Sequence, residues 1–114
     1  MSFLTDIDLE GVRRVDNLFA GAKIAGDLHI HNMDSVVYTS GMFEGAKGAN
    51  SISGIDLRNA VECYHMFNKV TTAHNLNLFV DGNFDMSKCK SIASMFAYSP
   101  FAKLPPLKNC DNVT

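Results

Sequence analysis

Hydrophobic positions recur along this chain in four segments that align without gaps, and each segment ends on Phe preceded by Leu or Met. The segments are IDLEGVRRVDNLF (7–19), HNMDSVVYTSGMF (31–43), IDLRNAVECYHMF (55–67) and FDMSKCKSIASMF (84–96). Their first residues are 24, 24 and 29 positions apart, and PLKNCDNVT (106–114) begins a fifth copy. A repeat of this length predicts a solenoid of stacked coils. We place the coil starts near residues 4, 28, 52, 76 and 104 of a single domain, 1–114, with the last coil incomplete.

Each unit alternates once between apolar and polar residues and then steps by three. The stretch IDL (7–9) puts alternate side chains on one face, as a short strand requires. The stretch VRRVDNLF (12–19) keeps one face of a short α- or 3-10 helix apolar. We therefore expect an α/β fold, a leucine-rich-repeat-like solenoid of short parallel strands and short helices with about 24 residues per coil.

The longer spacing before the fourth segment predicts an irregular insertion at 77–83. Leu76, Leu78 and Val80 alternate with polar or aromatic residues before Asp81-Gly82. This pattern indicates an additional extended stretch closed by a tight turn.

Several units resemble a known family of bacterial repeats. The units NLFAGAK (17–23) and GMFEGAK (41–47), together with the closing LPPLKNCDNVT (104–114), resemble the BspA-like, Met-Phe-type leucine-rich repeats of bacterial surface proteins and lipoproteins. The resemblance covers nearly the whole chain. It implies action through adhesion or other protein contacts, and it transfers no catalytic residue to this chain.

The function expected from the repeats is a non-enzymatic protein–protein interaction module. The alternative is a small phage or mobile-element inhibitor that binds and blocks a host defence enzyme, in the manner of an anti-CRISPR protein. A third class, an enzyme, requires a convergent set of acid, base, nucleophile or metal ligands, and the sequence does not suggest one. We therefore predict no enzymatic activity and no cofactor.

Composition narrows the partner and the compartment. The chain has 114 residues, 46% of them hydrophobic and 19% charged, with a formal net charge of −2. This balance gives no support for nucleic-acid binding, and no apolar run is long enough for a membrane span. The N-terminus lacks the pattern of a secretion signal. We predict a cytoplasmic protein of a bacterium or a phage-infected host, or a cell-surface protein if the chain is a fragment of a longer secreted one.

A polar column on the predicted strands is the candidate partner surface. The column consists of Asp8, Asn32, Asp56 and Asp85, and His29 completes the candidate surface. The column could form an acidic binding stripe, a weak Ca²⁺ site, or simply local caps of turns, to which Asp and Asn are suited. We favour the capping role and predict no metal site.

His29 and His31 would point the same way on a strand, which could start a metal site. However, His31 occupies a column that is apolar in the other units. Either His31 is half-buried there, or the register slips and Ile30 takes its place. We expect a structural or incidental role for both histidines.

The sequence Cys63-Tyr64-His65 has the composition of a nucleophile beside a base. On a helix, residues two apart do not face each other, so we predict no catalysis here.

Three cysteines cannot all pair within one chain, and we expect reduced thiols. Cys89 and Cys110 fall in the same column of adjacent coils, so a disulfide between these two residues is the alternative.

The last unit stops before its Met-Phe pair, which predicts an exposed apolar end. We expect this end to be covered by a second copy of the protein, in an end-to-end homodimer through Leu107, Cys110 and Val113. The alternative cover is a host protein.

Overall fold

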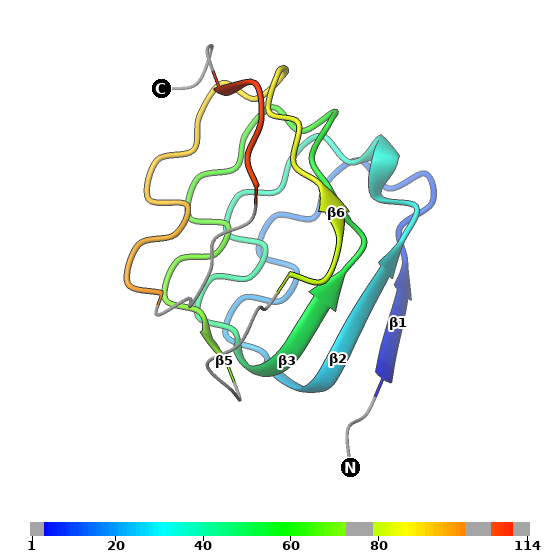
Figure 1. Cartoon of the computed structure of the whole chain (residues 1–114), viewed down its shortest axis with the longest axis vertical. Helices are drawn as coiled ribbons and strands as arrows, with labels where there is room; N and C mark the ends of the chain where they lie inside the picture. The colour runs from blue at the N-terminus through cyan, green and yellow to red at the C-terminus, as the bar shows by residue number, and fades with distance from the viewer. Residues whose placement is uncertain (1–3, 73–78, 100–105, 111–114) are drawn as a thin grey trace.

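The computed structural model describes residues 4–72, 79–99 and 106–110. Its main sheet has four strands in the order β1-β2-β3-β5, and a smaller sheet pairs β4 with β6 (Figure 1). All these pairs are parallel. The strands are β1 (Leu4–Asp8), β2 (Lys23–His31), β3 (Lys47–Ser53), β4 (Ile55–Asp56), β5 (Thr71–Thr72) and β6 (Gly82–Asn83).

The 24-residue period of the sequence reappears as stacking of the chain on itself. Opposite the main sheet, parallel bridges join Arg14 to Tyr38, Tyr38 to Glu62 and Glu62 to Ser91. These residues occupy equivalent positions in successive repeats. Figure 1 shows the chain returning behind the sheet in parallel serpentine courses, so that the strands form one curled side, a half-barrel, and the turns form the other.

The predicted α/β fold, with a helix behind each strand, is wrong. Among the described residues the only helix is the three-residue 3-10 helix η1 (Met33–Ser35). The positions expected to form helices instead form successive reverse turns. In the first coil, hydrogen bonds run from the N–H of Val12 to Leu9 (2.9 Å), of Leu18 to Val15 (3.0 Å) and of Ala22 to Phe19 (3.0 Å).

Left-handed residues explain why these turns do not propagate into helices. A residue with positive φ recurs at two places in each turn region, first Asn17, Gly41, His65 and Ser94, then Gly21, Gly45, Lys69 and Tyr98. A left-handed residue cannot continue a right-handed helix, whereas a type II turn requires one at its third position. In both a reverse turn and a helical turn, an apolar side chain comes back to the same face after three residues. The hydrophobic spacing therefore did not distinguish turns from helices.

The backbone groups that a helix would satisfy internally are bonded to the neighbouring coil. The N–H of Phe19 donates to the carbonyl of Met42 (2.7 Å), and that of Phe43 to the carbonyl of Met66 (2.8 Å). The N–H of Phe67 continues the ladder to the carbonyl of Met95 (2.8 Å). The turns therefore form a second hydrogen-bonded wall, parallel to the sheet.

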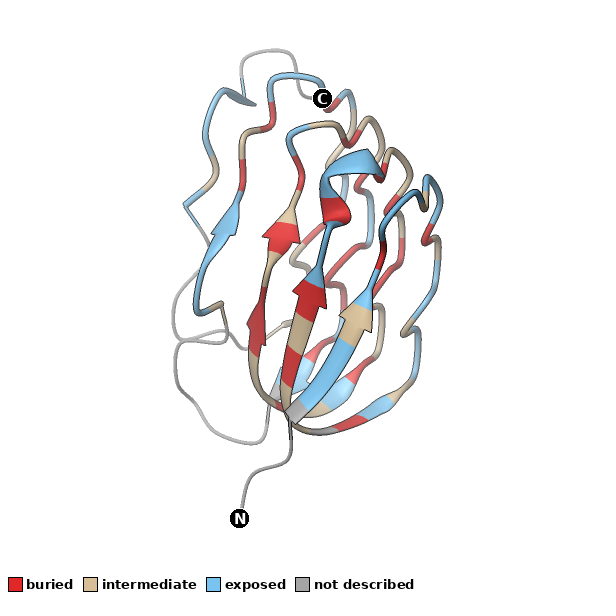
Figure 2. Cartoon of the chain, turned by 90° about the vertical axis from the view of Figure 1, so that its right-hand side faces the viewer, coloured by how far each residue is buried: buried red, intermediate tan, exposed pale blue. Residues whose placement is uncertain are grey.

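The core lies between the sheet and the wall of turns. A continuous stack of phenylalanine rings runs along it, with centroid separations of 5.2 Å for Phe19 and Phe43, 5.3 Å for Phe43 and Phe67, and 5.5 Å for Phe67 and Phe96. The rings of Phe43 and Phe67 are fully buried. Figure 2 shows buried residues recurring along β2 and β3, whereas the edge strand β1 is mostly exposed.

No helix among the described residues has the length and apolar character needed to cross a bilayer. The predicted insertion at 77–83 is partly described. Val80 is exposed, and the carboxylate of Asp81 accepts a hydrogen bond from the N–H of Gly54 (2.7 Å). Gly82 begins β6 and pairs with Ile55. The part of the prediction that rests on Leu76 and Leu78 lies outside the described residues.

Candidate functional site

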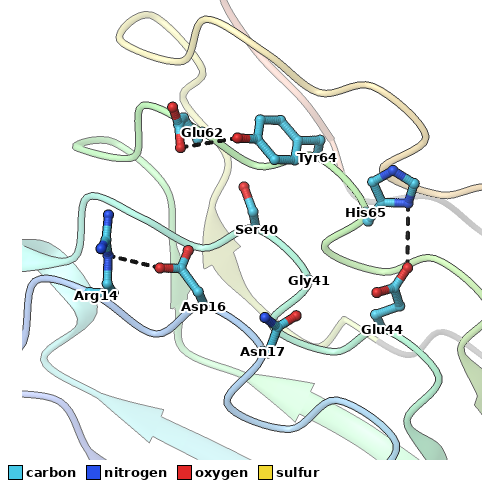
Figure 3. Close-up of a pocket in the computed structure, with 9 residues that line it drawn as sticks. All are labelled: Arg14, Asp16, Asn17, Ser40, Gly41, Glu44, Glu62, Tyr64 and His65. Carbon is cyan, nitrogen blue, oxygen red and sulfur yellow. Dashed lines mark hydrogen bonds and ion pairs between the residues drawn. The ribbon is translucent and has the colours of Figure 1, made fainter.

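The turn side of the molecule carries an open groove of about 470 Å³, shown in Figure 3. Three successive coils contribute equivalent positions to it, so the groove runs across the stack. We call it the turn-side groove, and its lining consists of Arg14, Asp16, Asn17, Ser40, Gly41, Glu44, Glu62, Tyr64 and His65.

Left-handed backbone positions from three coils line this groove. Asn17, Gly41 and His65 are equivalent residues with φ of 59°, 69° and 59°. At the middle position a Cβ atom would overlap the Asn17 side chain. Glycine at residue 41 therefore leaves space for the Asn17 amide between two coils.

Paired polar groups occupy one end of the turn-side groove. The guanidinium of Arg14 contacts the carboxylate of Asp16 at 2.8 Å and lies 4.3 Å from the centroid of the Tyr38 ring. The hydroxyl of Tyr64 donates to Glu62 Oε2 at 3.3 Å, as drawn in Figure 3. Arg14 neutralises Asp16, whereas the hydroxyl of Tyr64 leaves the negative charge of Glu62 in place.

A second polar cluster lies at the other end. Glu44 Oε2 accepts a hydrogen bond from Asn68 Nδ2 (2.8 Å) and lies 3.4 Å from His65 Nδ1. Asn68 is buried and fixes the position of the Glu44 carboxylate. With Glu62 at one end and Glu44 at the other, the turn-side groove presents two carboxylates that no Lys or Arg pairs with among the described residues.

Ser40 projects between these clusters in Figure 3. Its hydroxyl is buried and has no hydrogen-bond partner in the described part of the chain. His65 directs Nδ1 toward Glu44 and Asn68 instead. Ser40 and His65 therefore do not form the hydrogen-bonded pair that nucleophilic catalysis by serine requires.

The predicted polar column is present, and its three aspartates cap turns. The carboxylates of Asp8, Asp56 and Asp85 each accept a hydrogen bond from the backbone N–H two residues ahead, at 3.0, 3.2 and 3.0 Å. Asn32 Nδ2 donates to Asp8 Oδ1 at 3.0 Å, and Asn109 Nδ2 donates to Asp85 Oδ1 at 2.9 Å. For the three aspartates this is the local capping role predicted from the sequence, whereas the side chains of Asn32 and Asn109 join adjacent coils.

These hydrogen bonds favour the charged carboxylates. The side chain of Asn32 and the N–H of Glu10 lower the pKa of Asp8. The side chain of Asn109 and the N–H and hydroxyl of Ser87 lower the pKa of Asp85. As a candidate partner surface, the column of Asp8, Asn32, Asp56 and Asp85 with His29 stays a prediction.

Near His29 and His31, the second predicted alternative is the observed one. Ile30 is buried and pairs with Ile7, and the His31 side chain is exposed. His29 lies beside it on the outer face, with the two rings stacked at 4.5 Å between centroids. Asp6, whose carboxylate lies 3.0 Å from His31 Nε2, was not predicted from the sequence. Asp6 is brought to the two histidines by the pairing of β1 with β2, and this pairing is known only from the fold.

Cys63 and His65 occupy different environments. Cys63 is fully buried and its sulfur accepts a hydrogen bond from the Thr39 hydroxyl at 3.3 Å, while His65 lines the turn-side groove. The neighbouring Cys89 thiol and burial raise the pKa of the Cys63 thiol, so it stays protonated. All the cysteines are free thiols, including the exposed Cys110.

The predicted end-to-end contact is described only in part. Leu107 is half-buried against the core, and Cys110 is exposed. Val113 lies outside the described residues. The contact therefore stays a prediction.

The turn-side groove itself was missed because its lining residues share no chemical type along the sequence. Arg14 and Glu62 occupy equivalent repeat positions but carry opposite charges. Asp16 and Tyr64 are also equivalent, yet one is acidic and the other aromatic. The only signal in the sequence was their common spacing of 24 residues from the repeat.

Comparison with known proteins identifies one family. Residues 2–105 match the family model described as "Mycoplasma protein of unknown function, DUF285". Neither the curated proteins nor the solved structures contain a significant match to the chain.

Proposed function

This chain belongs to the DUF285 family, and on that premise we propose that it is a non-enzymatic protein-binding module whose contact surface is the turn-side groove. The observation that carries the proposal is that three stacked coils build one groove with a polar, partly aromatic lining. Repeat proteins bind partners on such surfaces because equivalent positions of successive coils lie side by side. The resemblance of the repeats to BspA-like surface proteins supports the same class of function.

The charge of the turn-side groove specifies the chemistry of the partner. Glu44 and Glu62 lie at opposite ends, and the single arginine in the lining is already paired with Asp16. A partner segment with Lys or Arg side chains spaced to meet both carboxylates complements this arrangement. Tyr64 is 37% exposed between them, and tyrosine is among the residues that contribute most to binding at interfaces.

Peptide binding tests this proposal. The probe is a displayed library of random peptides, selected on the wild-type protein and then measured as individual peptides. We expect selected peptides to be enriched in Lys and Arg. We also expect the double variant Tyr64→Ala, Glu62→Lys to weaken their binding by about 2 kcal/mol or more, the range of interface hot spots.

A matched control separates the turn-side groove from general electrostatics. Tyr98 is 84% exposed, Glu10 is exposed, and neither residue lines the groove. The double variant Tyr98→Ala, Glu10→Lys makes the same chemical changes elsewhere, and we expect it to bind the peptides nearly as well as wild type. Equal losses in both double variants would reject the turn-side groove as the contact surface.

The identity of the natural partner separates adhesion from inhibition. Capture from the native host with wild type and with the Tyr64→Ala, Glu62→Lys variant, followed by mass spectrometry, identifies partners that depend on the turn-side groove. A surface molecule supports the adhesion class, and a host defence enzyme supports the inhibitor class. Self-association through Leu107, Cys110 and Val113 is a separate proposal, and light scattering that shows only monomer at micromolar concentration contradicts it.

A further inference from the structure

We propose that Asp6, His29 and His31 form a binding site for a divalent transition-metal ion, of which Zn²⁺ is the representative. Each side chain offers one donor atom, and these atoms all lie within 4.8 Å of one another. Two imidazoles and a carboxylate suit Zn²⁺, Ni²⁺ and Cu²⁺, whereas Ca²⁺ and Mg²⁺ prefer oxygen ligands alone.

The backbone of the main sheet brings these three residues together. In the parallel pairing of β1 with β2, Asp6 lies opposite His29 and Asp8 lies opposite His31. Residues two apart on a strand face the same side. The three donors therefore stand on the outer face of two hydrogen-bonded strands, which fixes their separation.

The three donor atoms lie close together, but the two imidazole rings are stacked rather than turned toward a common ion. His31 Nε2 lies 3.0 Å from Asp6 Oδ1, and the rings of His29 and His31 stack with an interplanar angle of 12°. Zn²⁺ binds nitrogen and oxygen donors at about 2.0–2.2 Å, so donors around one ion lie up to roughly 4 Å apart. To share one ion, His29 and His31 must rotate out of their parallel stack, because a metal lies in the plane of each imidazole ring that binds it.

Solvent can reach the cluster. The side chains of His31 and Asp6 are 46% and 56% exposed, so an ion has an open path of entry. Three protein ligands leave a fourth position for water or for a group from a binding partner, as in open zinc sites.

The surrounding charge also favours a cation. Asp8 lies opposite His31 in the pairing of β1 with β2, and its carboxylate is held by Asn32 and by the N–H of Glu10. These hydrogen bonds hold the Asp8 carboxylate, so it adds negative charge beside the three ligands rather than acting as one of them.

An ion at this site would link the edge strand β1 to β2. Within the described part of the chain, strand β1 pairs only with β2 in the main sheet. A ligand that binds the folded state raises its stability by mass action. The thermal midpoint of unfolding should therefore rise with the concentration of Zn²⁺.

The test measures Zn²⁺ binding by calorimetry on the untagged protein. The exposed thiol of Cys110 is a competing zinc ligand, so the parent for all variants is Cys110→Ser. We expect one equivalent of Zn²⁺ to bind. We expect Asp6→Asn and His31→Gln each to weaken its affinity by at least about tenfold, since even changes outside the ligand sphere reduce affinity 10–100-fold.

A histidine outside the cluster supplies a matched control. His65→Gln removes the same donor group from the turn-side groove and should leave Zn²⁺ affinity unchanged. Affinity that is the same in Asp6→Asn, His31→Gln and the parent overturns the proposal. Affinity lost in His65→Gln overturns it as well.

A second measurement needs only the parent. In the parent, Zn²⁺ should shift the NMR signals of the ring C–H groups of His29 and His31 while those of His65 stay in place. Co²⁺ should give visible d–d absorption of a low-coordinate site, and Ca²⁺ should produce neither change. Shifts confined to His65, or no shifts with excess Zn²⁺, would reject the site.

Discussion

Replacing Phe43 by alanine tests whether the phenylalanine stack is the continuous core of the coils. Phe43 is fully buried, and its ring stacks on Phe19 at 5.2 Å and on Phe67 at 5.3 Å between centroids. Truncating a buried Phe to Ala costs about 3–5 kcal/mol. Each aromatic pair adds about 0.5–1.5 kcal/mol beyond area burial, so we expect Phe43→Ala to fall in the upper half of the first range.

Two comparison variants separate volume from stacking. Phe19 lies at the end of the stack, is partly buried and has one stacked partner, so Phe19→Ala should cost about 1–3 kcal/mol. Phe43→Leu keeps an apolar side chain in the same space but loses both aromatic contacts. We expect it to cost about 1–2 kcal/mol.

Urea unfolding followed by far-UV circular dichroism measures these differences, because the chain has no tryptophan. The midpoint and slope give the free energy of unfolding, against the 5–15 kcal/mol typical of whole domains. If Phe43→Ala lowers the free energy of unfolding no more than Phe19→Ala does, the stack is not the core that links the coils. If Phe43→Leu costs as much as Phe43→Ala, the division between volume and stacking is wrong.

Three further predictions follow from single contacts. Gly54→Ala should destabilise the fold by about 1–3 kcal/mol more than Gly11→Ala in urea unfolding, because both glycines have positive φ but only at Gly54 would the Cβ overlap a backbone carbonyl of the neighbouring strand. Asn109→Ala should raise the pKa of Asp85 in an NMR titration, and wild type should lose the stability contributed by this carboxylate as the pH falls through its lowered folded pKa; an unchanged pKa would contradict the assigned hydrogen bond. Cys110 should react with iodoacetamide in the native protein while the two buried thiols react only on unfolding, and modification of all three at the same rate would contradict the observed burial.

The sequence allowed much of the core to be predicted but not the local conformation that surrounds it. Val12, Val15 and Phe19 recur at steps of three and four, and this spacing was taken as a helix. Asn17 adopts a left-handed conformation between them and closes a reverse turn instead. A single residue type does not mark this position, because Asn17, Gly41, His65 and Ser94 all occupy it.

Both candidate sites depended on contacts between coils. The turn-side groove combines residues about 24 and 48 positions apart that share no chemical type. The proposed metal site needed Asp6 to lie opposite His29, a register that follows from Ile7 pairing with Ile30 rather than with His31. The sequence of one strand could not choose between these registers. One register places Ile30 opposite Ile7, the other places His31 there, and both side chains can pack in that column.

By itself, the sequence determined that this protein is a repeat whose apolar columns stack into one core, because hydrophobic spacing follows directly from the residues. The tertiary structure alone decided that the units are turns rather than helices, since the deciding backbone hydrogen bonds, such as that from Phe19 to Met42, join different coils. It also decided which polar residues meet on each face. These contacts between polar residues depend on the register between coils. The register is set by pairing across the stack rather than by local sequence.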